Sequence, residues 1–286
     1  MDKTFDGWLC GALGVLIFSG SMPATRAALA GFDPVFLTVA RAALAGGLAL
    51  ALLLLFRQKR PAREDFVSLG VVALGVVLGF PLLTALALRY INAAQSQIFL
   101  GLLPLATASF GVLRAGERPH AGFWLCAGLG SFCVIGVALT HGAQLPAAGV
   151  ALMLAAIIIC GLGYAEGARL SRKLGGWQVI SWALVLALPV MLLACWLSAP
   201  ASLAHVPGGA WGGLAYVSAF SMLLGFVFWY RGLALGGIAT VGQLQLLQPA
   251  AGLAVSAVVL HETVPPAMLA ATAAIVLCVA GAKKLA

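Results

Sequence analysis

Charged residues are scarce in this chain of 286 residues. Asp, Glu, Lys and Arg together make up 8% of the sequence, against roughly 25% in an ordinary soluble domain. Hydrophobic residues make up 63%, so a water-soluble globule of this composition could not cover its surface with polar side chains. The composition excludes a separate soluble catalytic domain and is enough for roughly nine or ten membrane-spanning helices of about 20 residues each.

Motifs for metal, nucleotide and covalent chemistry are missing as well. The six cysteines lie inside apolar runs and form no Cys-x-x-Cys pair, which indicates small buried side chains and not zinc ligands. A Gly-x-x-x-x-Gly-Lys-Ser/Thr loop is absent, which argues against ATP-driven machinery. None of the four histidines lies inside a predicted span. We therefore expect no cofactor, no metal and no enzyme activity.

The long apolar runs predict the fold class, an all-α membrane protein with ten transmembrane helices. Charged residues, proline and glycine separate the runs, and each run is close to the length that crosses a bilayer. The first run is too long for a signal peptide, so we expect it to be retained. The predicted spans are 7–29, 34–56, 66–88, 92–113, 121–140, 148–170, 177–197, 209–230, 237–260 and 266–283.

The basic residues predict the orientation of the chain. Thirteen of the sixteen Lys and Arg residues fall on one side of the predicted spans, which the positive-inside rule identifies as the cytoplasm. Both termini then lie in the cytoplasm, with the protein in a bacterial-type inner (plasma) membrane. Because the basic residues are explained as topology signals, the net charge of +8 does not indicate a nucleic-acid partner, and we expect none. The expected partners are the lipid bilayer and a small-molecule substrate, and the sequence leaves open whether the chain is a monomer or a homodimer.

The chain contains an internal repeat. A shift of 145 residues aligns Pro104 with Pro249 and Glu117 with Glu262, and both residue types are rare here. The repeat predicts one membrane domain made of two five-helix halves, residues 1–143 and 144–286. Because five is odd, the halves have opposite orientations, which is the inverted repeat of many secondary transporters. This symmetry predicts alternating access. A scaffold or a membrane-embedded enzyme with a duplicated sequence is the alternative.

These residues resemble the EamA type of the drug/metabolite transporter superfamily. The stretch 20–26, Gly-Ser-Met-Pro-Ala-Thr-Arg, closes the first predicted helix, Arg41 follows in the second, and Pro104 leads to Glu117. The second half repeats the last pattern, with histidine in place of glycine before the glutamate. Within the superfamily the chain looks most like the aromatic amino-acid exporter group typified by YddG. The resemblance implies export of small metabolites, amino acids above all, through a central cavity.

Other kinds of transporter fit the sequence less well. A small multidrug-type antiporter needs a carboxylate in its first membrane helix, and residues 7–29 contain none. A nucleotide-sugar or sugar-phosphate carrier needs several cations in its cavity, and only Arg41 lies deep in a predicted span. A drug or nucleotide-sugar-type metabolite carrier is the alternative function. Because no Asp or Glu is predicted near the midplane, we expect facilitated diffusion or exchange without obligatory proton antiport.

Two prolines fall near the middle of predicted spans. Pro104 and Pro249 lie about 14 Å from a helix end at 1.5 Å per residue. Proline donates no backbone hydrogen bond and frees the carbonyl four residues earlier, which predicts unpaired acceptors at Leu100 and Gln245. Paired breaks near the midplane point to a substrate site and to gating. Kinks that only shape the bundle are the alternative.

Glutamines and aromatic residues are the other candidates for the substrate site. Gln245 and Gln248 share a helix face, and Gln97 lies in the fourth predicted span. Neutral amides donate and accept hydrogen bonds, which suits a zwitterion, while plain interhelical hydrogen bonds are the alternative. Aromatic residues away from the interfaces could line a pocket for apolar or aromatic cargo, with core packing as the alternative: Phe80, Phe99, Tyr164, Trp182 and Tyr216.

Charged residues within or beside the spans need partners. Arg41 lies about 10 Å into its span, too deep for easy snorkelling, so it has to meet carbonyls, a cavity or an anion. We interpret it as a structural charge, with carboxylate binding as the alternative. Glu117 and Glu262 are predicted to cap the helices that follow them. Glu166 is predicted to form an ion pair with Arg169, three residues further on.

Overall fold

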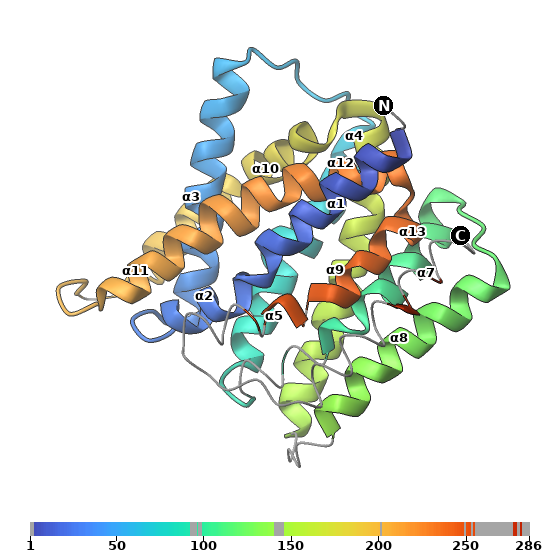
Figure 1. Ribbon diagram of the computed structural model, residues 1–286. Coiled ribbons are helices and arrows are strands. Elements are labelled where there is room, and N and C mark those ends of the chain that lie inside the picture. Colours follow the sequence, from blue (N-terminus) through green and yellow to red (C-terminus); the bar gives the residue numbers. More distant parts are fainter. Residues whose placement is uncertain are drawn as a thin grey trace.

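The computed structural model describes residues 3–91, 96, 99–139, 146–200, 202–248, 250–252, 254, 277, 278 and 281, without the side chains of 133–139. Within this part of the chain the regular secondary structure is helical and contains no strand. Figure 1 shows the helices packed against one another and joined by short connections. The predicted all-helical class is confirmed for the described residues.

In the described part of the chain, six helical stretches are long and apolar enough to cross a membrane. Three of them are single helices, α3 (Pro34–Leu55), α9 (Ala147–Leu174) and α10 (Gly176–Leu197). Lys3–Ala28 consists of α1 (Lys3–Ser19) and α2 (Ser21–Ala28). Asp65–Ala87 consists of α4 (Asp65–Val72), η1 (Ala73–Gly79) and α5 (Phe80–Ala87). Gly208–Gly236 consists of α11 (Gly208–Ala215), η2 (Tyr216–Leu224) and α12 (Gly225–Gly236).

The other predicted spans are described in part. The shorter helix α7 (Leu103–Ala115) covers the second half of the fourth predicted span, and α8 (Ala121–Leu139) covers the fifth. The ninth begins with α13 (Ile238–Gly242) and η3 (Gln243–Leu247). Most of the ninth span beyond 248 and nearly all of the tenth lie outside the described residues. The count of ten helices therefore stays a prediction.

Apolar side chains cover the outside of the bundle. Leu55, Val67 and Leu113 are between 73% and 76% exposed, and each lies on a helix or at its end. Exposed apolar surface on this scale marks contact with a nonpolar partner, and apolar helices of this length are those that span bilayers. The chain is a multi-pass membrane protein.

Helix boundaries follow from the chemistry of single residues. The Oδ1 of Asp33 accepts a hydrogen bond from the backbone nitrogen of Val35 at 2.8 Å, and Pro34 occupies the first turn of α3, which is a favourable helix start. At the end of α7, Gly116 has a φ of +67°, a left-handed conformation that glycine adopts at low cost. This turn leads the chain at Glu117 away from α7.

Glycines allow α1 and α12 to lie side by side (Figure 1). A Cβ atom placed on Gly232 would lie 2.6 Å from the backbone nitrogen of Gly11, and one placed on Gly7 would lie 2.6 Å from the nitrogen of Gly236. Between membrane helices such close van der Waals contact is a main source of attraction, because lipid is as apolar as the side chains. The contact joins the two predicted halves.

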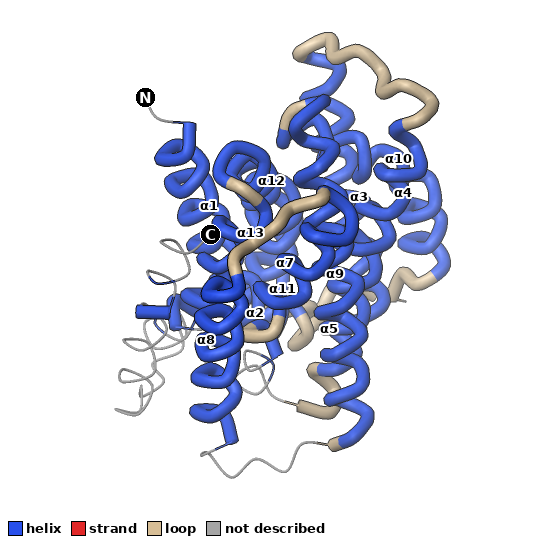
Figure 2. Tube along the Cα trace, turned by 90° about the vertical axis from the view of Figure 1, so that its right-hand side faces the viewer, coloured by secondary structure: helices blue, strands red, loops and turns tan. Residues whose placement is uncertain are grey.

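Helix α9 lies within the bundle and connects its parts. It contacts α4, η1, α5 and α7 from the first half, and α10 and α12 from the second. Figure 2 shows it among these helices in the perpendicular view. Its buried residues include Cys160, Tyr164 and Glu166. The helix therefore carries both polar and apolar side chains into the interior.

Three described segments depart from α-helical geometry. η1 and η2 are π-helical and η3 is a 3-10 helix. The amide of Phe80 donates to the carbonyl of Gly75, and the amide of Gly225 donates to that of Phe220, each five residues back. Pro81 follows η1, and proline clashes with the carbonyl four residues before it, which gives a reason for the wider turn. Such turns within helices often mark functional sites.

We predict that Gly232→Ala destabilises the protein, because its methyl group would lie 2.6 Å from the Gly11 nitrogen. Overpacking of this kind costs about 1–3 kcal/mol, so the melting temperature in detergent should fall. Gly47→Ala is the matched control, since nothing lies within 4 Å of a Cβ at Gly47. It should leave the melting temperature unchanged or slightly higher. Equal melting temperatures for the two variants would contradict the close contact.

Candidate functional site

A cavity of about 40 Å³ lies inside the bundle, between elements of both predicted halves. It has room for a few water molecules. The three segments that depart from α-helical geometry border on it through Val76 of η1, Ser221 of η2 and Gln248 directly after η3. The wall consists of Phe18, Ser21, Met22, Thr25, Arg41, Val76, Phe80, Pro81, Thr84, Leu103, Tyr164, Ser221, Phe226 and Gln248.

Arg41 of α3 is the charged residue of this wall. It is 8% exposed, and its Nη2 donates to the Oγ of Ser221 at 3.4 Å. The Oγ of Ser21 donates to the same Ser221 oxygen at 2.7 Å. The Nε of Arg41 is buried without a partner, and no carboxylate pairs with the guanidinium among the described residues. The cavity therefore holds a cation without a protein counter-ion in the described part of the chain.

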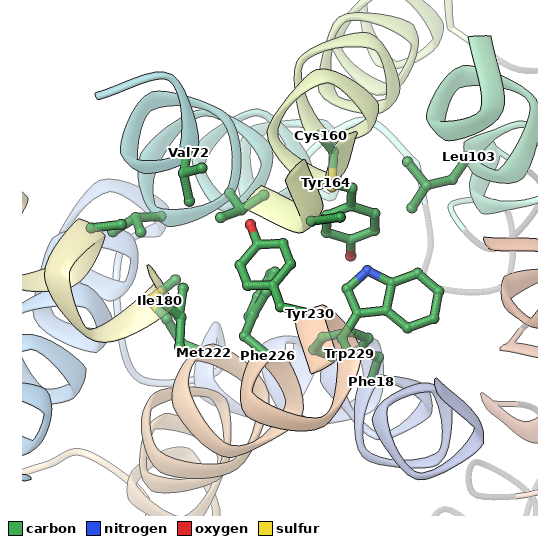
Figure 3. Packing of buried hydrophobic residues seen from close by; sticks show 14 of the residues in the cluster. Phe18, Val72, Leu103, Cys160, Tyr164, Ile180, Met222, Phe226, Trp229 and Tyr230 are labelled. Atoms are coloured by element: carbon green, nitrogen blue, oxygen red, sulfur yellow. The ribbon is translucent and has the colours of Figure 1, made fainter. Parts of the chain in front are cut away.

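Hydroxyl and aromatic side chains complete the wall. The Oγ1 of Thr84 is buried and has no hydrogen-bond partner among the described residues. The ring of Tyr164 lies 5.8 Å from Phe226 and 5.5 Å from Trp229, and Phe18 lies 5.0 Å and 6.2 Å from the same two rings, between centroids. Figure 3 shows these four rings gathered in the interior. Three of these rings, Phe18, Tyr164 and Phe226, thus line the cavity together with hydroxyl side chains.

Apart from Gln245, which is buried but is not one of the wall residues, the predicted substrate-site residues divide into three groups. Those on the cavity wall are Phe80, Tyr164 and Gln248. Phe99 and Trp182 pack in the hydrophobic core, and the Oη of Tyr216 donates to the carbonyl of Ile17 at 2.8 Å, so these three aromatics do not line the cavity. Gln97 lies outside the described part of the chain, as do Pro249, which was predicted for gating, and Glu262, which was predicted as a structural charge.

The segment before Pro249 differs from the predicted kink. In the 3-10 turn of η3 the amide of Gln248 donates to the carbonyl of Gln245. That carbonyl has a donor, contrary to the prediction, because in the tighter turn an amide three residues later can reach it. The side chain of Gln245 is unpaired instead: it is 1% exposed, and neither amide atom has a partner among the described residues.

Pro104 also differs from its prediction as a mid-helix kink. It lies in the first turn of α7, where it begins a helix and does not bend one. The Oγ of Ser131 in α8 donates to the carbonyl of Gly101 at 2.7 Å, in the turn that leads into α7. A neighbouring helix thus satisfies a backbone acceptor that lies at membrane depth.

Ion pairs join the predicted halves at one end of the bundle. The carboxylate of Glu166 is fully buried and accepts from the Nε of Arg114 at 2.9 Å and from the Nη2 of Arg169 at 2.5 Å. The predicted pair with Arg169 is confirmed, and Arg114 adds a link to α7. The Nζ of Lys173 reaches the Oδ1 of Asp65 at 2.9 Å. Helix α9 is therefore tied to α7 and to α4.

Glu117 caps a helix, but not the one that follows it. Its two oxygens accept from the backbone nitrogens of Ile238 and Ala239 at 2.9 and 2.8 Å, in the first turn of α13. Arg172 donates to the same carboxylate at 2.8 Å. The predicted cap on α8 is wrong, because the turn at Gly116 leads Glu117 to α13, whose free N–H groups and dipole favour an anion. The first half thereby holds the segment that carries the glutamines.

These contacts define the basic end of the bundle, formed by residues 57–65, 114–118 and 166–173. The Arg41 side of the cavity lies away from this end, since Arg41 is about two turns into α3 and α3 runs on to Leu55, next to residue 57. Among the described ion pairs, that of Arg89 with Asp33 lies near the opposite end, and it is exposed and confined to the first half. Among the described ion pairs, those between the predicted halves therefore all lie at the basic end.

A multi-pass helical bundle with a cavity between elements of both predicted halves fits a membrane transporter as the class of protein. The EamA-like transporter family matches the chain twice, over residues 6–140 and 147–282. These matches cover most of the chain and fit a two-repeat architecture. The chain belongs to the EamA-like transporter family, part of the drug/metabolite transporter superfamily.

Individual relatives agree with this assignment. The chain is 60% identical over 286 residues to the uncharacterized transporter YdeK of Bacillus subtilis (strain 168), with 100% of both chains covered. It is 25% identical over 237 residues to the uncharacterized transporter YyaM of the same organism, covering 77% of this chain and 75% of YyaM. One crystal structure of a protein has the same fold, with a TM-score of 0.80 at 21% identity, over 98% of this chain and 99% of that one.

Sequence reasoning missed several residues of the cavity wall. Ser21, Thr84 and Ser221 are hydroxyl residues within apolar predicted spans, and Ser21 lies in the stretch 20–26 that carries the family resemblance. A polar residue in such a position can indicate a side chain that faces a cavity, so the sequence could have identified these three. Phe226 has no such signal, because its place on the wall depends on how α12 packs against α1 and α9.

We predict that Glu166→Gln lowers the melting temperature more than Arg89→Gln does. Loss of the buried carboxylate leaves Arg114 and Arg169 unpaired, which costs about 3 kcal/mol, the lower part of the range for buried pairs, because both arginines are close to half exposed. The exposed pair of Arg89 is worth at most about 1 kcal/mol. Thermal denaturation in detergent measures both. Equal decreases in melting temperature would show that the buried ion pair stabilises the protein no more than the exposed one.

Proposed function

We propose that the protein exports small zwitterionic metabolites, most of all amino acids with apolar or aromatic side chains, as in the aromatic amino-acid exporter group. The observation that carries this proposal is Arg41, a buried cation in the cavity wall with no counter-ion among the described residues. A substrate carboxylate would supply the partner through charge-assisted hydrogen bonds. Gln248 can accept from the ammonium group, and Phe80 and Tyr164 suit an apolar side chain.

The charge of the cavity wall supports this substrate class over the alternatives. A nucleotide sugar or sugar phosphate carries more than one negative charge, and Arg41 is the one cation of the described wall. A cationic drug would be repelled by an unpaired guanidinium. An amino acid has one carboxylate for the guanidinium, and its ammonium group can bind neutral acceptors and aromatic faces.

The transport mechanism that we infer is alternating access. The positive-inside rule places the basic end in the cytoplasm, with both termini there and the protein in a bacterial-type inner membrane. The Arg41 side of the cavity then lies in the outer half, and the ion pairs of Glu117, Glu166 and Lys173 close the cytoplasmic side. Export requires these pairs to separate while the outer side closes. The turns of η1, η2 and η3 are places where the backbone can bend.

Arg41→Gln is expected to abolish discrimination between phenylalanine and phenylalaninamide. In proteoliposome counterflow the wild-type protein should favour phenylalanine about tenfold or more, because a hydrogen bond to a charged group is worth about 1.5–3 kcal/mol. The variant should transport the two with similar, low efficiency, and Arg41→Lys should retain part of the preference because it keeps the charge.

Arg26→Gln is the control for the Arg41 experiment, because Arg26 is exposed and does not line the cavity. It should keep the full preference for the carboxylate. If Arg41→Gln lowers transport of both compounds by the same factor, Arg41 is a structural charge and the proposed substrate contact is wrong.

Uptake into liposomes with defined internal substrate should follow the substrate gradient. An imposed pH gradient should not change this uptake. The described cavity wall contains no Asp or Glu that could alternately bind a proton and the substrate. Glu166, the buried acid in α9, is held by two arginines. Protein-free liposomes are the control. Concentrative uptake driven by the pH gradient alone, and abolished in Glu166→Gln, would overturn this expectation and assign proton coupling to Glu166.

A further inference from the structure

We propose that a second polar site lies between the Arg41 cavity and the ion pairs of the basic end, and that it binds the zwitterionic head group of the substrate when the basic end opens. The site is formed by Gln243 and Gln245 of η3, Thr107 of α7 and Trp229 of α12. We call these four residues the inner polar cluster. The choice of an amino acid as ligand rests on the proposed function, whereas the site itself rests on the following observations.

The inner polar cluster contains six polar atoms without hydrogen-bond partners among the described residues. They are both amide atoms of Gln243, both amide atoms of Gln245, the Oγ1 of Thr107 and the Nε1 of Trp229. All four residues are at most 1% exposed. Buried polar atoms are almost always hydrogen-bonded, so this concentration of exceptions calls for a bound polar partner in another state of the protein.

The elements that carry the inner polar cluster are neighbours, since η3 contacts α7, and α9 contacts both α7 and α12. A Cβ placed on Gly242, at the turn into η3, would lie 3.5 Å from the Cγ2 of Thr107. The ring of Tyr164 in α9 lies 5.5 Å from that of Trp229. In Figure 3 the indole nitrogen of Trp229 faces the hydroxyl of Tyr164.

The inner polar cluster lies between the cavity and the basic end. Tyr164 borders on both, because it is a wall residue of the Arg41 cavity and also contacts the cluster. Glu166, the centre of the buried ion pairs, follows Tyr164 by two positions in α9. Gln243 lies about one and a half turns beyond Ile238, whose amide is held by Glu117. A substrate that leaves the cavity toward the basic end would pass these groups.

The chemistry of the inner polar cluster is neutral and matches a zwitterion. The amide NH₂ groups, the indole N–H and the hydroxyl can donate to a carboxylate, while the amide oxygens and the hydroxyl can accept from an ammonium group. The four side chains carry no formal charge, so they offer little to a phosphate dianion, which would need cations. The Arg41 cavity uses a full charge for the same substrate, and this difference separates the two sites chemically.

Gln243→Leu and Gln245→Leu test the inner polar cluster, because leucine fills a similar volume without polar atoms. Both variants should raise the melting temperature, since they remove amides that are unpaired in this state. The KM for phenylalanine presented at the basic end should rise about tenfold, while the KM at the opposite face changes less than about twofold. Inside-out and right-side-out membrane vesicles measure the two faces separately. Gln245→Asn, which keeps an amide, should recover part of the loss.

Ser181→Ala is the matched control for these variants. The Oγ of Ser181 in α10 is equally buried and unpaired among the described residues, but it belongs to neither site. The control should not lower the melting temperature and should leave both KM values unchanged.

Three results would overturn the second site. If both leucine variants lower the melting temperature, the amides have structural partners. If the melting temperature rises and neither KM changes, no substrate passes the amides. If both KM values rise equally, the glutamines belong to the Arg41 cavity. Failure of the proposed function looks different: the wild-type protein would show no saturable phenylalanine transport, and the zwitterion assignment would fall with it, while the melting temperatures would still report on the amides.

Discussion

The structure depends on one constraint, that a polar group at membrane depth has to find its partner inside the protein. Water cannot satisfy a carbonyl there, so the hydroxyl of Ser131 in a neighbouring helix pairs with the carbonyl of Gly101. The same constraint gathers both arginines around Glu166. Each such pairing connects helices that the apolar surfaces alone would leave free to slide, because lipid and side chains are equally apolar.

The contacts at the basic end couple the two halves to the cavity. Glu117 of the first half holds the first turn of α13, and α13 continues into η3 and then to Gln248, which lines the cavity. Helix α9 carries Glu166 at the basic end and Tyr164 on the cavity wall, two positions apart. Separation of the ion pairs would therefore move two parts of the wall, which is the mechanical link that alternating access requires.

The sequence predicted the helical class, the limits of most described spans to within a few residues, and the burial of Arg41 within its helix, because these depend on apolar length and on where a charge falls in an apolar run. It could not predict which helix Glu117 caps, because that partner lies about 120 residues away and depends on how the halves pack. The 3-10 turn of η3 was missed for a related reason: an α-helix and a 3-10 helix share local sequence preferences, and the surrounding packing selects between them. The exclusion of Tyr216 and Trp182 from the wall likewise follows from packing.

Buried polar atoms are expected to have hydrogen-bond partners. In the described part of the chain, most of the exceptions lie along one path through the molecule. Unpaired buried atoms occur on Arg41 and Thr84 in the cavity and on Gln243 and Gln245 below it. Each such atom costs about 1–3 kcal/mol, and such failures are expected at functional sites. A conformation in which a substrate forms hydrogen bonds with these atoms is stabilised by them, whereas the conformation described here has none of these hydrogen bonds. That difference is what allows a ligand to shift the populations of two states, since a ligand shifts an equilibrium only by its unequal affinity for them.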